Sequence, residues 1–182
     1  CREVLGTIVL IGLDGGRRGE VRGARDPDWD VECHGLARPQ VAAEVYSRAG
    51  AMCDVIVGND VEFGFMAGDY DRGLDKAREL VANGAQIAVY KMGEKGAITI
   101  TPEAEIATGI YRTEALKPTG AGDSFMGGFI SGLADGLGVR DAVLRGSAAA
   151  AMVVARVGCA PAMPTPAELD QFLTEHAGPS AA

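Results

Sequence analysis

The sequence has few histidines, no paired cysteines and no long apolar run, and each absence removes a class of protein. Only His34 and His176 occur among 182 residues, and the four cysteines form no C-x-x-C pair, so the ligand spacing of a zinc site is missing. No stretch approaches the 18 consecutive apolar residues of a membrane-spanning helix, and no secretory signal pattern opens the sequence. We therefore expect neither a zinc protein nor a membrane protein.

Positive charge is also scarce. Lys and Arg total 17 against 25 Asp and Glu, a formal net charge of −8, which argues against nucleic acid or an anionic membrane as a partner. A nucleotide remains compatible, because local donors and a metal ion can outweigh the overall charge. The four cysteines are scattered singly, which is typical of a reducing compartment, and we expect the protein to be cytoplasmic.

The hydrophobic fraction of 47% and charged fraction of 23% are ordinary for one globular domain. Residues 1–40 differ from the rest, because Gly, Arg and Asp follow one another there without periodicity. Their arginines could form a phosphate-binding patch, but we favour a disordered or misread segment. An intact reading frame through this stretch of the gene would exclude a misread one. We expect the folded domain over residues 41–174 and a tail over 175–182.

From residue 40 onward, strand and helix patterns alternate. Apolar runs predict strands at 53–57, 87–90 and 97–100, and a short one at 7–11. Apolar residues at helical spacing predict helices at 40–49, 69–83, 124–137, 139–156 and 166–176. This alternation predicts an α/β fold with a mainly parallel sheet. Ligands of such sheets bind beyond the carboxyl ends of the strands.

The most informative run is residues 117–125, which read Lys-Pro-Thr-Gly-Ala-Gly-Asp-Ser-Phe ahead of a predicted helix. Backbone N–H groups at a glycine-rich helix start can bind an anion, and Asp123 beside it could accept a proton from an attacking hydroxyl. With 26 glycines in the chain, Gly-x-Gly-Asp arises by chance about 0.3 times. An ordinary glycine turn capped by Asp therefore explains the run equally well on its own.

Two other motifs directly follow predicted strands. Asn59 and Glu62 lie three residues apart and could hold a hydrated Mg²⁺, although a capping box at a helix start explains them as well. Residues 91–96 read Lys-Met-Gly-Glu-Lys-Gly, and their glycines suit either a close ligand or a plain hairpin turn. A dinucleotide-binding fingerprint is excluded, because Gly122 is followed by Phe125 where that motif requires glycine.

The order and spacing of these three motifs over residues 41–174 resemble the ribokinase-like (PfkB) family of carbohydrate kinases. The Thr-Gly-Ala-Gly-Asp-Ser-Phe run of residues 119–125 is similar to that family's second signature. Three segments, residues 57–64, 91–97 and 111–119, resemble most closely the members that phosphorylate 5-dehydro-2-deoxygluconate in myo-inositol catabolism. The resemblance implies a three-layer α/β/α sandwich truncated on its N-terminal side.

It also implies roles for individual residues. Asp123 would be the base that takes the sugar hydroxyl proton, and Gly120, Ala121 and Gly122 would form the anion hole for the transferring phosphoryl group. Asn59 and Glu62 would organise Mg²⁺. ATP would be bordered by Lys91, Gly93, Gly96, Gly120, Gly122 and Ser147, and residues 147–159 would help to wall the adenine pocket. Relatives often bind a monovalent cation such as K⁺ where this sequence has Thr113, Ala115 and Gly158.

The sequence also departs from the family. Members are about twice as long, and the missing N-terminal half supplies the first signature, most sugar contacts and a small β-sheet lid. An inactive remnant that binds nucleotide is therefore an alternative to an active sugar-acid kinase. Kinases for ribose, fructose or 2-keto-3-deoxygluconate are further alternatives, because most specificity residues are absent. The expected partners are ATP and a small sugar acid, and a homodimer is compatible with the resemblance.

Overall fold

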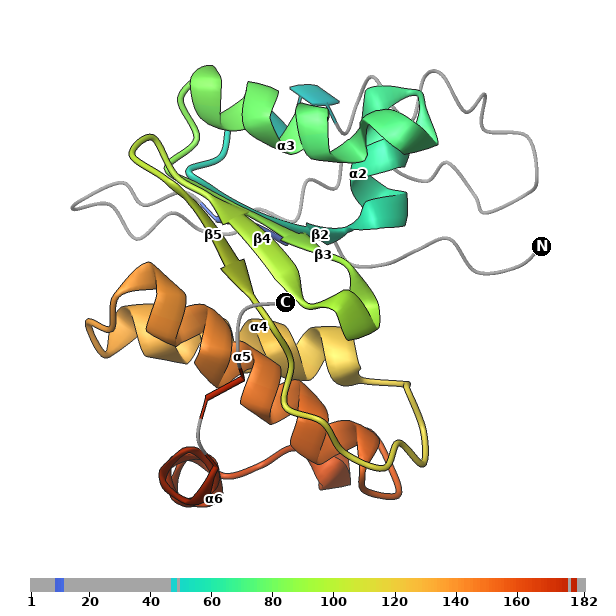
Figure 1. The fold of residues 1–182 in the computed structure, drawn as a ribbon, viewed down its shortest axis with the longest axis vertical. Helices are drawn as coiled ribbons and strands as arrows, with labels where there is room; N and C mark the ends of the chain where they lie inside the picture. Colours follow the sequence, from blue (N-terminus) through green and yellow to red (C-terminus); the bar gives the residue numbers. More distant parts are fainter. Residues whose placement is uncertain (1–8, 12–46, 49, 177, 180–182) are drawn as a thin grey trace, which may run out of the picture. The chain divides into compact units, whose positions relative to one another are not determined.

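The computed structural model describes residues 9–11, 47–48, 50–176 and 178–179 (Figure 1). The chain divides into two compact units. The first comprises Cys1–Tyr90 and Ile100–Ala104, and the second comprises Lys91–Thr99 and the residues from 105 onward. Most of the segment expected to be atypical, residues 1–40, and most of the helix predicted at 40–49 lie outside the described residues.

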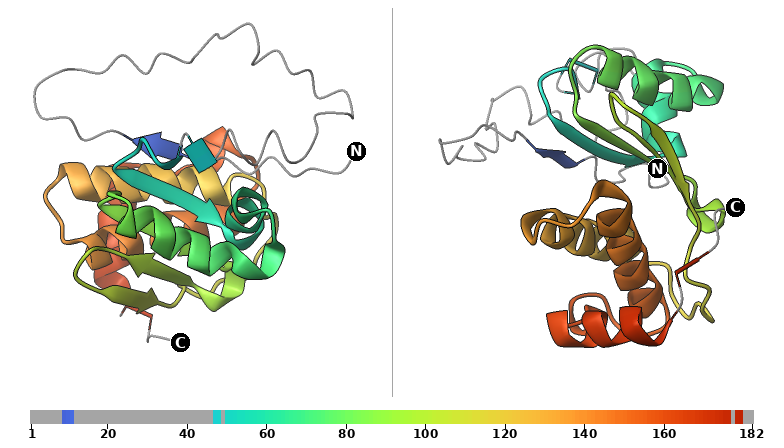
Figure 2. Two further views of the ribbon diagram at one scale, coloured as in Figure 1. Left: turned by 90° about the horizontal axis from the view of Figure 1, so that it is seen from above. Right: turned by 60° about the vertical axis from the view of Figure 1, so that its left-hand side comes forward.

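The first unit contains strands β1 (Val9–Ile11), β2 (Val55–Asn59) and β3 (Ile87–Lys91), with helices α2 (Asp60–Ala67) and α3 (Gly73–Ala82) between β2 and β3. Figures 1 and 2 show α2 and α3 on one face of β2 and β3. The apolar side of α3 faces inward, since Ala77 and Leu80 are buried while the intervening Arg78 and Glu79 are exposed. A 3-10 turn (Tyr70–Arg72) precedes α3, so the helix predicted over residues 69–83 begins later than expected.

The strands form one sheet in the order β1-β2-β3-β4-β5. Strand β1 runs antiparallel to β2, with Leu10 opposite Ile56. A tight turn, Gly93–Lys95, joins β3 to β4 (Ala97–Ile100), and Met92 N donates to Gly96 O at 2.8 Å, which closes a hairpin. The expectation of a mainly parallel sheet is therefore wrong, because hairpins and the antiparallel β1 make the sheet mixed.

Strand β5 (Glu105–Thr108) was not expected from the sequence. Of its four residues only Thr108 is buried, so it carries neither an apolar run nor a clear alternation. Thr101 N donates to Ala104 O at 2.9 Å in the turn that precedes it. Thr108 Oγ1 donates to Ala97 O at 3.4 Å and links the strand to β4.

The second unit holds helices α4 (Ala121–Ala134), α5 (Val139–Val154) and α6 (Pro166–Glu175). Helices α4 and α5 lie side by side (Figure 1) and approach closely through small residues. A Cβ on Gly128 would lie 2.8 Å from Arg145 O, and one on Gly132 would lie 3.0 Å from the Ala142 Cα. Ala149 of α5 contributes to this packing, since its Cβ lies 3.0 Å from the Cβ position of Gly128.

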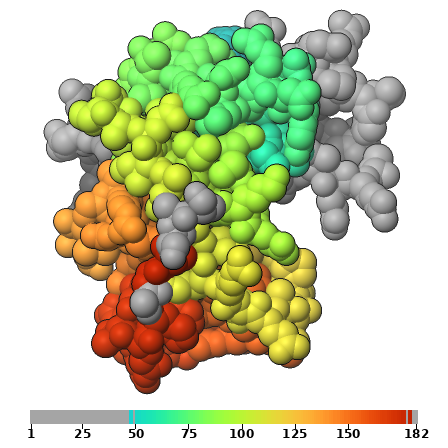
Figure 3. Space-filling model, in the orientation of Figure 1, coloured from blue at the N-terminus to red at the C-terminus, as the bar shows by residue number. Residues whose placement is uncertain are grey.

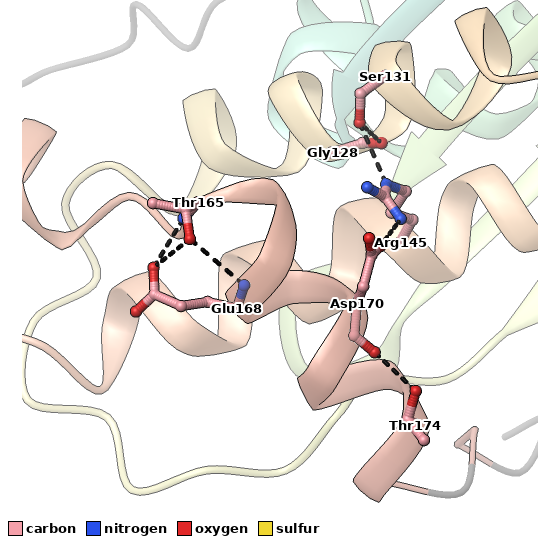
Figure 4. Close-up of polar contacts among 7 residues, drawn as sticks. All are labelled: Gly128, Ser131, Arg145, Thr165, Glu168, Asp170 and Thr174. Atoms are coloured by element: carbon pink, nitrogen blue, oxygen red, sulfur yellow. Dashed lines mark hydrogen bonds and ion pairs between the residues drawn. The ribbon is translucent and has the colours of Figure 1, made fainter.

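Arg145 joins all three helices of the second unit (Figure 4). Its side chain is only 10% exposed and forms an ion pair with Asp170 of α6 at 2.6 Å. Its Nε donates to Ser131 Oγ of α4 at 3.2 Å, and Ser131 in turn donates to Gly128 O at 3.0 Å. This network pairs a nearly buried charge and holds α6 against the other two helices.

Helix α6 lies at the surface of the second unit (red in Figure 3) and buries only Leu169. A capping box starts it: Thr165 Oγ1 accepts from Glu168 N at 3.3 Å, and Thr165 N donates to Glu168 Oε2 at 2.8 Å (Figure 4). None of the described helices is long and apolar enough to cross a membrane.

Candidate functional site

The glycine run (residues 120–123) forms the start of helix α4. Gly120 is the N-cap residue and has a left-handed backbone, with φ 90° and ψ −5°, which favours glycine. Ser124 N donates to Gly120 O at 2.9 Å and closes the first helical turn. Ala121 N donates to Pro118 O at 3.3 Å. The N–H groups at the start of a helix have no partner within the helix, so those of Gly122 and Asp123 can bind an anion.

Space around the run differs from one glycine to the next. A Cβ on Gly120 would lie 3.5 Å from Val153 Cγ1 and 3.7 Å from Cys159 Cβ, so this residue packs against helix α5 and the loop after it. A Cβ on Gly122 would have only Lys91 Nζ within 4 Å, at 3.8 Å. Gly122 and Asp123 are both exposed. The run therefore presents an open face, bordered by one ammonium group, to solvent.

Lys91 is the last residue of β3 and reaches the start of α4. Besides its approach to Gly122, its Nζ lies 5.5 Å from the ring centroid of Phe125, a cation–π contact. Phe125 is only 6% exposed. The structure thus brings together Lys91 and the glycine run, which the sequence placed in separate motifs.

The remaining residues expected to border the nucleotide are Gly93, Gly96 and Ser147. Gly93 has φ 59° and nothing within 4 Å of its Cβ position, whereas a Cβ on Gly96 would collide with the carbonyl oxygen of Thr108. Packing of the hairpin against β5 therefore explains Gly96 without a ligand. Ser147 is buried in α5, the helix that packs against α4.

Asn59 and Glu62 form a capping box at the start of α2. Asn59 Oδ1 accepts from Glu62 N at 2.8 Å, and Asn59 N donates to Glu62 Oε2 at 2.5 Å. Glu62 is 6% exposed, and a Cβ on Gly58 would lie 3.0 Å from Glu62 Oε2, so glycine there lets the carboxylate fold back. The capping box, one of the two interpretations of this motif, is present.

The donor chemistry of this pair also fits a hydrated magnesium ion. Mg²⁺ in phosphate sites is held by one or two protein oxygens, waters and substrate phosphates, and carboxylate and amide oxygens can accept more than one contact. Among the described residues, no group of three or more His, Cys, Asp or Glu side chains could hold a metal. Two oxygen donors alone suit an ion that is also bound by phosphates and waters.

Sequence reasoning missed the contacts of Cys159 beside the glycine run. Lys117 Nζ donates to Cys159 Sγ at 3.5 Å, and Cys159 Sγ contacts Thr119 O at 3.9 Å. These contacts join residues that flank the run to a loop about 40 positions further along the chain. No local pattern signals such a contact, since it depends on how α5 returns past α4.

Comparison with known proteins assigns the chain to a class of enzymes. Residues 23–166 match the family described as pfkB family carbohydrate kinase. The chain belongs to this family of carbohydrate kinases.

A curated relative named 5-dehydro-2-deoxygluconokinase, from Geobacillus kaustophilus, is 36% identical over 159 residues, covering 85% of this chain and 48% of the relative. The chain thus spans about half the length of the curated relatives it matches.

Solved structures of the same fold include aminoimidazole riboside kinase from Salmonella enterica, complexed with aminoimidazole riboside and an ATP analog. It is 26% identical with a TM-score of 0.66, over 76% of this chain and 48% of that one. Fructokinase from Vibrio cholerae, with fructose, ADP and calcium ion bound, is also 26% identical with a TM-score of 0.66, over 76% and 46% of the two chains. The predicted ribokinase-like α/β fold is confirmed, and the match covers only part of each neighbour.

Proposed function

We propose that the chain carries the phosphoryl-transfer part of an ATP-dependent sugar-acid kinase, which converts 5-dehydro-2-deoxygluconate to its 6-phosphate. The observation that carries this proposal is the start of α4, where Gly122 and Asp123 are exposed in the first turn and Lys91 Nζ lies 3.8 Å from the Cβ position of Gly122. Membership of the pfkB family supports the reaction type. The name of the Geobacillus relative supports the substrate.

In this proposal the glycine run stabilises the transferring group. The expected anion hole is Gly120, Ala121 and Gly122, but the Ala121 N–H already donates to Pro118 O at 3.3 Å. The N–H groups of Gly122 and Asp123 are fixed by the helix before ATP arrives, so they bind developing negative charge without reorganising. The α4 dipole adds partial positive charge at the same place. Because phosphoryl transfer passes through a loose transition state, positioning and charge stabilisation contribute most of the rate.

Asp123 accepts the proton of the sugar hydroxyl as it attacks. It is exposed on the first turn of α4, where a substrate can reach it. Its carboxylate also orients the hydroxyl in line with the terminal phosphate. The sugar's other contacts would come from the half of the relatives that this chain does not span.

Magnesium would be held by Asn59 and Glu62 through water, and when bound it would neutralise phosphate charge. A monovalent cation near Thr113, Ala115 and Gly158 belongs to the same proposal. The cysteines that the structure describes, Cys53 and Cys159, form no disulfide bond, and a cytoplasmic location belongs to the same proposal.

A second function is compatible with the placement of the expected nucleotide-binding residues in one unit: a nucleotide-binding remnant without turnover. The glycine run, Lys91, Gly93, Gly96 and Ser147 all belong to the second unit, so its nucleotide-binding residues do not depend on the missing half for their local fold. The sugar contacts do depend on it. Phosphorylation of another sugar would use the same proposed anion hole, so other sugars are tested as substrates in the same assay.

An ADP-release assay coupled to NADH oxidation separates these functions. The full chain is incubated with ATP, Mg²⁺ and 5-dehydro-2-deoxygluconate, with ribose, fructose and 2-keto-3-deoxygluconate in parallel, and Asp123→Asn serves as the blank. We expect sugar-dependent ADP release that the blank lacks. ATP binding by calorimetry without turnover on any sugar would favour the remnant, and turnover on another sugar alone would overturn the proposed substrate. Failure to bind ATP would overturn both functions.

A further inference from the structure

The side chain of Lys117 reaches the loop that follows helix α5, and its position carries one further inference. Lys117 is partly buried and lies three residues before Gly120. Its Nζ donates to Cys159 Sγ at 3.5 Å. Cys159 packs against Gly120 in turn, since its Cβ lies 3.7 Å from the Cβ position of that glycine. The ammonium group therefore contacts a residue that itself packs on the glycine run.

The backbone of Lys117 is fixed at the end of α5. Val154 is the last residue of that helix, and its carbonyl oxygen accepts from Leu116 N at 2.8 Å and from Lys117 N at 3.1 Å. The last turn of α5 contains no basic residue, although the carbonyl end of a helix favours positive charge nearby. Lys117 brings a positive charge to the loop after this end of the helix from a different segment of the chain.

The proposed function includes a monovalent cation near Thr113, Ala115 and Gly158, and the donors at this place fit such an ion poorly. Proteins bind K⁺ through oxygen atoms that replace its hydration shell. The side chain that follows Gly158 is the thiol of Cys159, and sulfur is a soft ligand that suits other metals. Residues 112–116 are all exposed, so this segment does not enclose an ion.

Carbonyl groups of the loop after α5 already accept hydrogen bonds. Cys159 O accepts from Ala162 N at 3.0 Å, and Ala162 O accepts from Arg156 Nη1 at 3.4 Å. The charge of Arg156 is paired with Glu168 at 2.9 Å. The Lys117 ammonium contacts the same loop, and it would repel a second cation placed there. The loop therefore fits a cation that belongs to the chain better than one taken from solution.

We propose that the Lys117 ammonium is the cation of this site, so that the chain binds ATP without a monovalent cation from solution. This inference rests on the proposed function and replaces the separate monovalent ion in it with a side chain. Lys117 is a positioning residue in this account. Its contact with Cys159 ties the loop after α5 to the segment that leads into the glycine run. The N–H groups of Gly122 and Asp123 are thereby held in place whatever salt surrounds the protein.

A purely structural role for Lys117 makes a different prediction. If the ammonium only packed the loop, its removal would lower stability and would create no need for an ion. If it is the cation of the site, a carboxylate in its place supplies the oxygen ligands that the loop lacks. Such a variant should then need K⁺ for the binding that wild type achieves without it. The dependence of ATP affinity on K⁺ therefore separates the two roles.

The experiment uses the full chain and titration calorimetry with ATP and Mg²⁺. Each protein is titrated in potassium chloride and in choline chloride at the same ionic strength, because choline is too large to replace K⁺. Wild type is compared with Lys117→Met, which removes the charge but keeps a long flexible side chain, and with Lys117→Asp. Lys76→Met is the matched control, because Lys76 lies on α3 and pairs with Glu79 at 2.9 Å.

We expect wild type and Lys76→Met to bind ATP equally well in the two salts. Lys117→Met should bind about tenfold more weakly than wild type in both, the loss that removal of one charge-assisted contact produces. Lys117→Asp should show at least that loss in choline and should regain about tenfold in K⁺. If Lys117→Asp fails to fold, which a thermal melt reveals, Lys117→Glu takes its place.

Three results would overturn this inference alone. They are a wild type whose ATP affinity rises about tenfold in K⁺, a Lys117→Met variant that binds as wild type does, and a carboxylate variant that K⁺ does not rescue. A wild type that binds ATP in neither salt would overturn the proposed function together with it.

Discussion

Gly146 of helix α5 lies against the carbonyl oxygen of Phe125 in helix α4, at a distance that leaves no room for a side chain. A Cβ on Gly146 would lie 2.7 Å from that oxygen and 3.2 Å from the Phe125 ring. The obstructing atom is backbone, so it cannot rotate away. This contact fixes the spacing of the two helices just behind the glycine run.

Gly146→Ala should therefore destabilise the chain by about 1–3 kcal/mol through overpacking, although alanine is the better helix former. Gly127→Ala is the matched control: Gly127 lies on α4, is exposed, and has nothing within 4 Å of its Cβ position. It should stabilise the chain by about 0.5–1 kcal/mol. Urea unfolding of the three proteins measures both. Equal effects of the two substitutions would contradict the close helix contact.

Long, strongly patterned elements of the fold were predictable from the sequence. Helices α5 and α6 end within two residues of their predicted ends, and β4 matches its predicted range, because buried faces impose a regular spacing of apolar residues. The failures have separate local causes. Strand β5 has one buried residue and no pattern. The helix expected from residue 69 begins at Gly73, because Tyr70–Arg72 form a separate 3-10 turn that the Asp69 side chain caps.

The candidate site was predictable in its parts but not in its assembly. The glycine run lies at a helix start as expected, although α4 begins at Ala121 rather than at Ser124. Asn59 and Lys91 were expected just after two strands and are the last residues of β2 and β3. The approach of Lys91 to Gly122 could not be read from spacing, since the two residues lie in different elements and meet only through tertiary packing. The same holds for Cys159 beside Gly120. The sequence identifies residues that could bind phosphate. The fold shows that Lys91 lies beside Gly122 of the glycine run.

Gly122→Ala is expected to separate stability from anion binding. The new methyl group would lie 3.8 Å from Lys91 Nζ, an ordinary contact, so the fold should be unchanged or slightly more stable. The same methyl group would occupy the open space beside Lys91 Nζ, where the proposed function expects a phosphate to bind. We expect affinity for ATP and tripolyphosphate to fall at least about tenfold, the loss of one charge-assisted contact. Calorimetry measures the affinity, and Gly127→Ala controls for added helix propensity. Unaltered tripolyphosphate affinity would show that the anion binds elsewhere.

Asp123→Asn should remove proton transfer while leaving the nucleotide site intact. The amide keeps the size of the carboxylate but cannot accept the hydroxyl proton, so kcat should fall by about 10³-fold or more, with ATP affinity within about threefold of wild type. Asp135→Asn makes the same change at the other end of α4, where Asp135 is the C-cap residue, and should keep kcat near wild type. Steady-state kinetics and calorimetry on the same preparations give both quantities. Near-normal turnover of Asp123→Asn would exclude Asp123 as the base.

The capping box of α6 should make the stability of the chain depend on pH. Hydrogen bonds from the Thr165 backbone N–H, at 2.8 Å, and the Thr165 hydroxyl, at 2.9 Å, together with Arg156, lower the pKa of Glu168 below its usual value. A carboxyl with a lowered pKa in the folded state stabilises the fold above its unfolded pKa, about 4.3. That contribution disappears as pH falls through the lower folded value.

Glu168→Gln tests this dependence, because glutamine can still close a capping box but carries no charge. Wild type should be more stable than the variant at pH 7, and the difference should shrink steadily as pH falls from about 5 toward 3. Glu103→Gln, in the exposed turn before β5, controls for the general loss of one carboxylate. Urea unfolding of the three proteins across this range measures the differences. A difference that stays constant with pH, or that grows in acid, would show that the charge of Glu168 does not act through the cap.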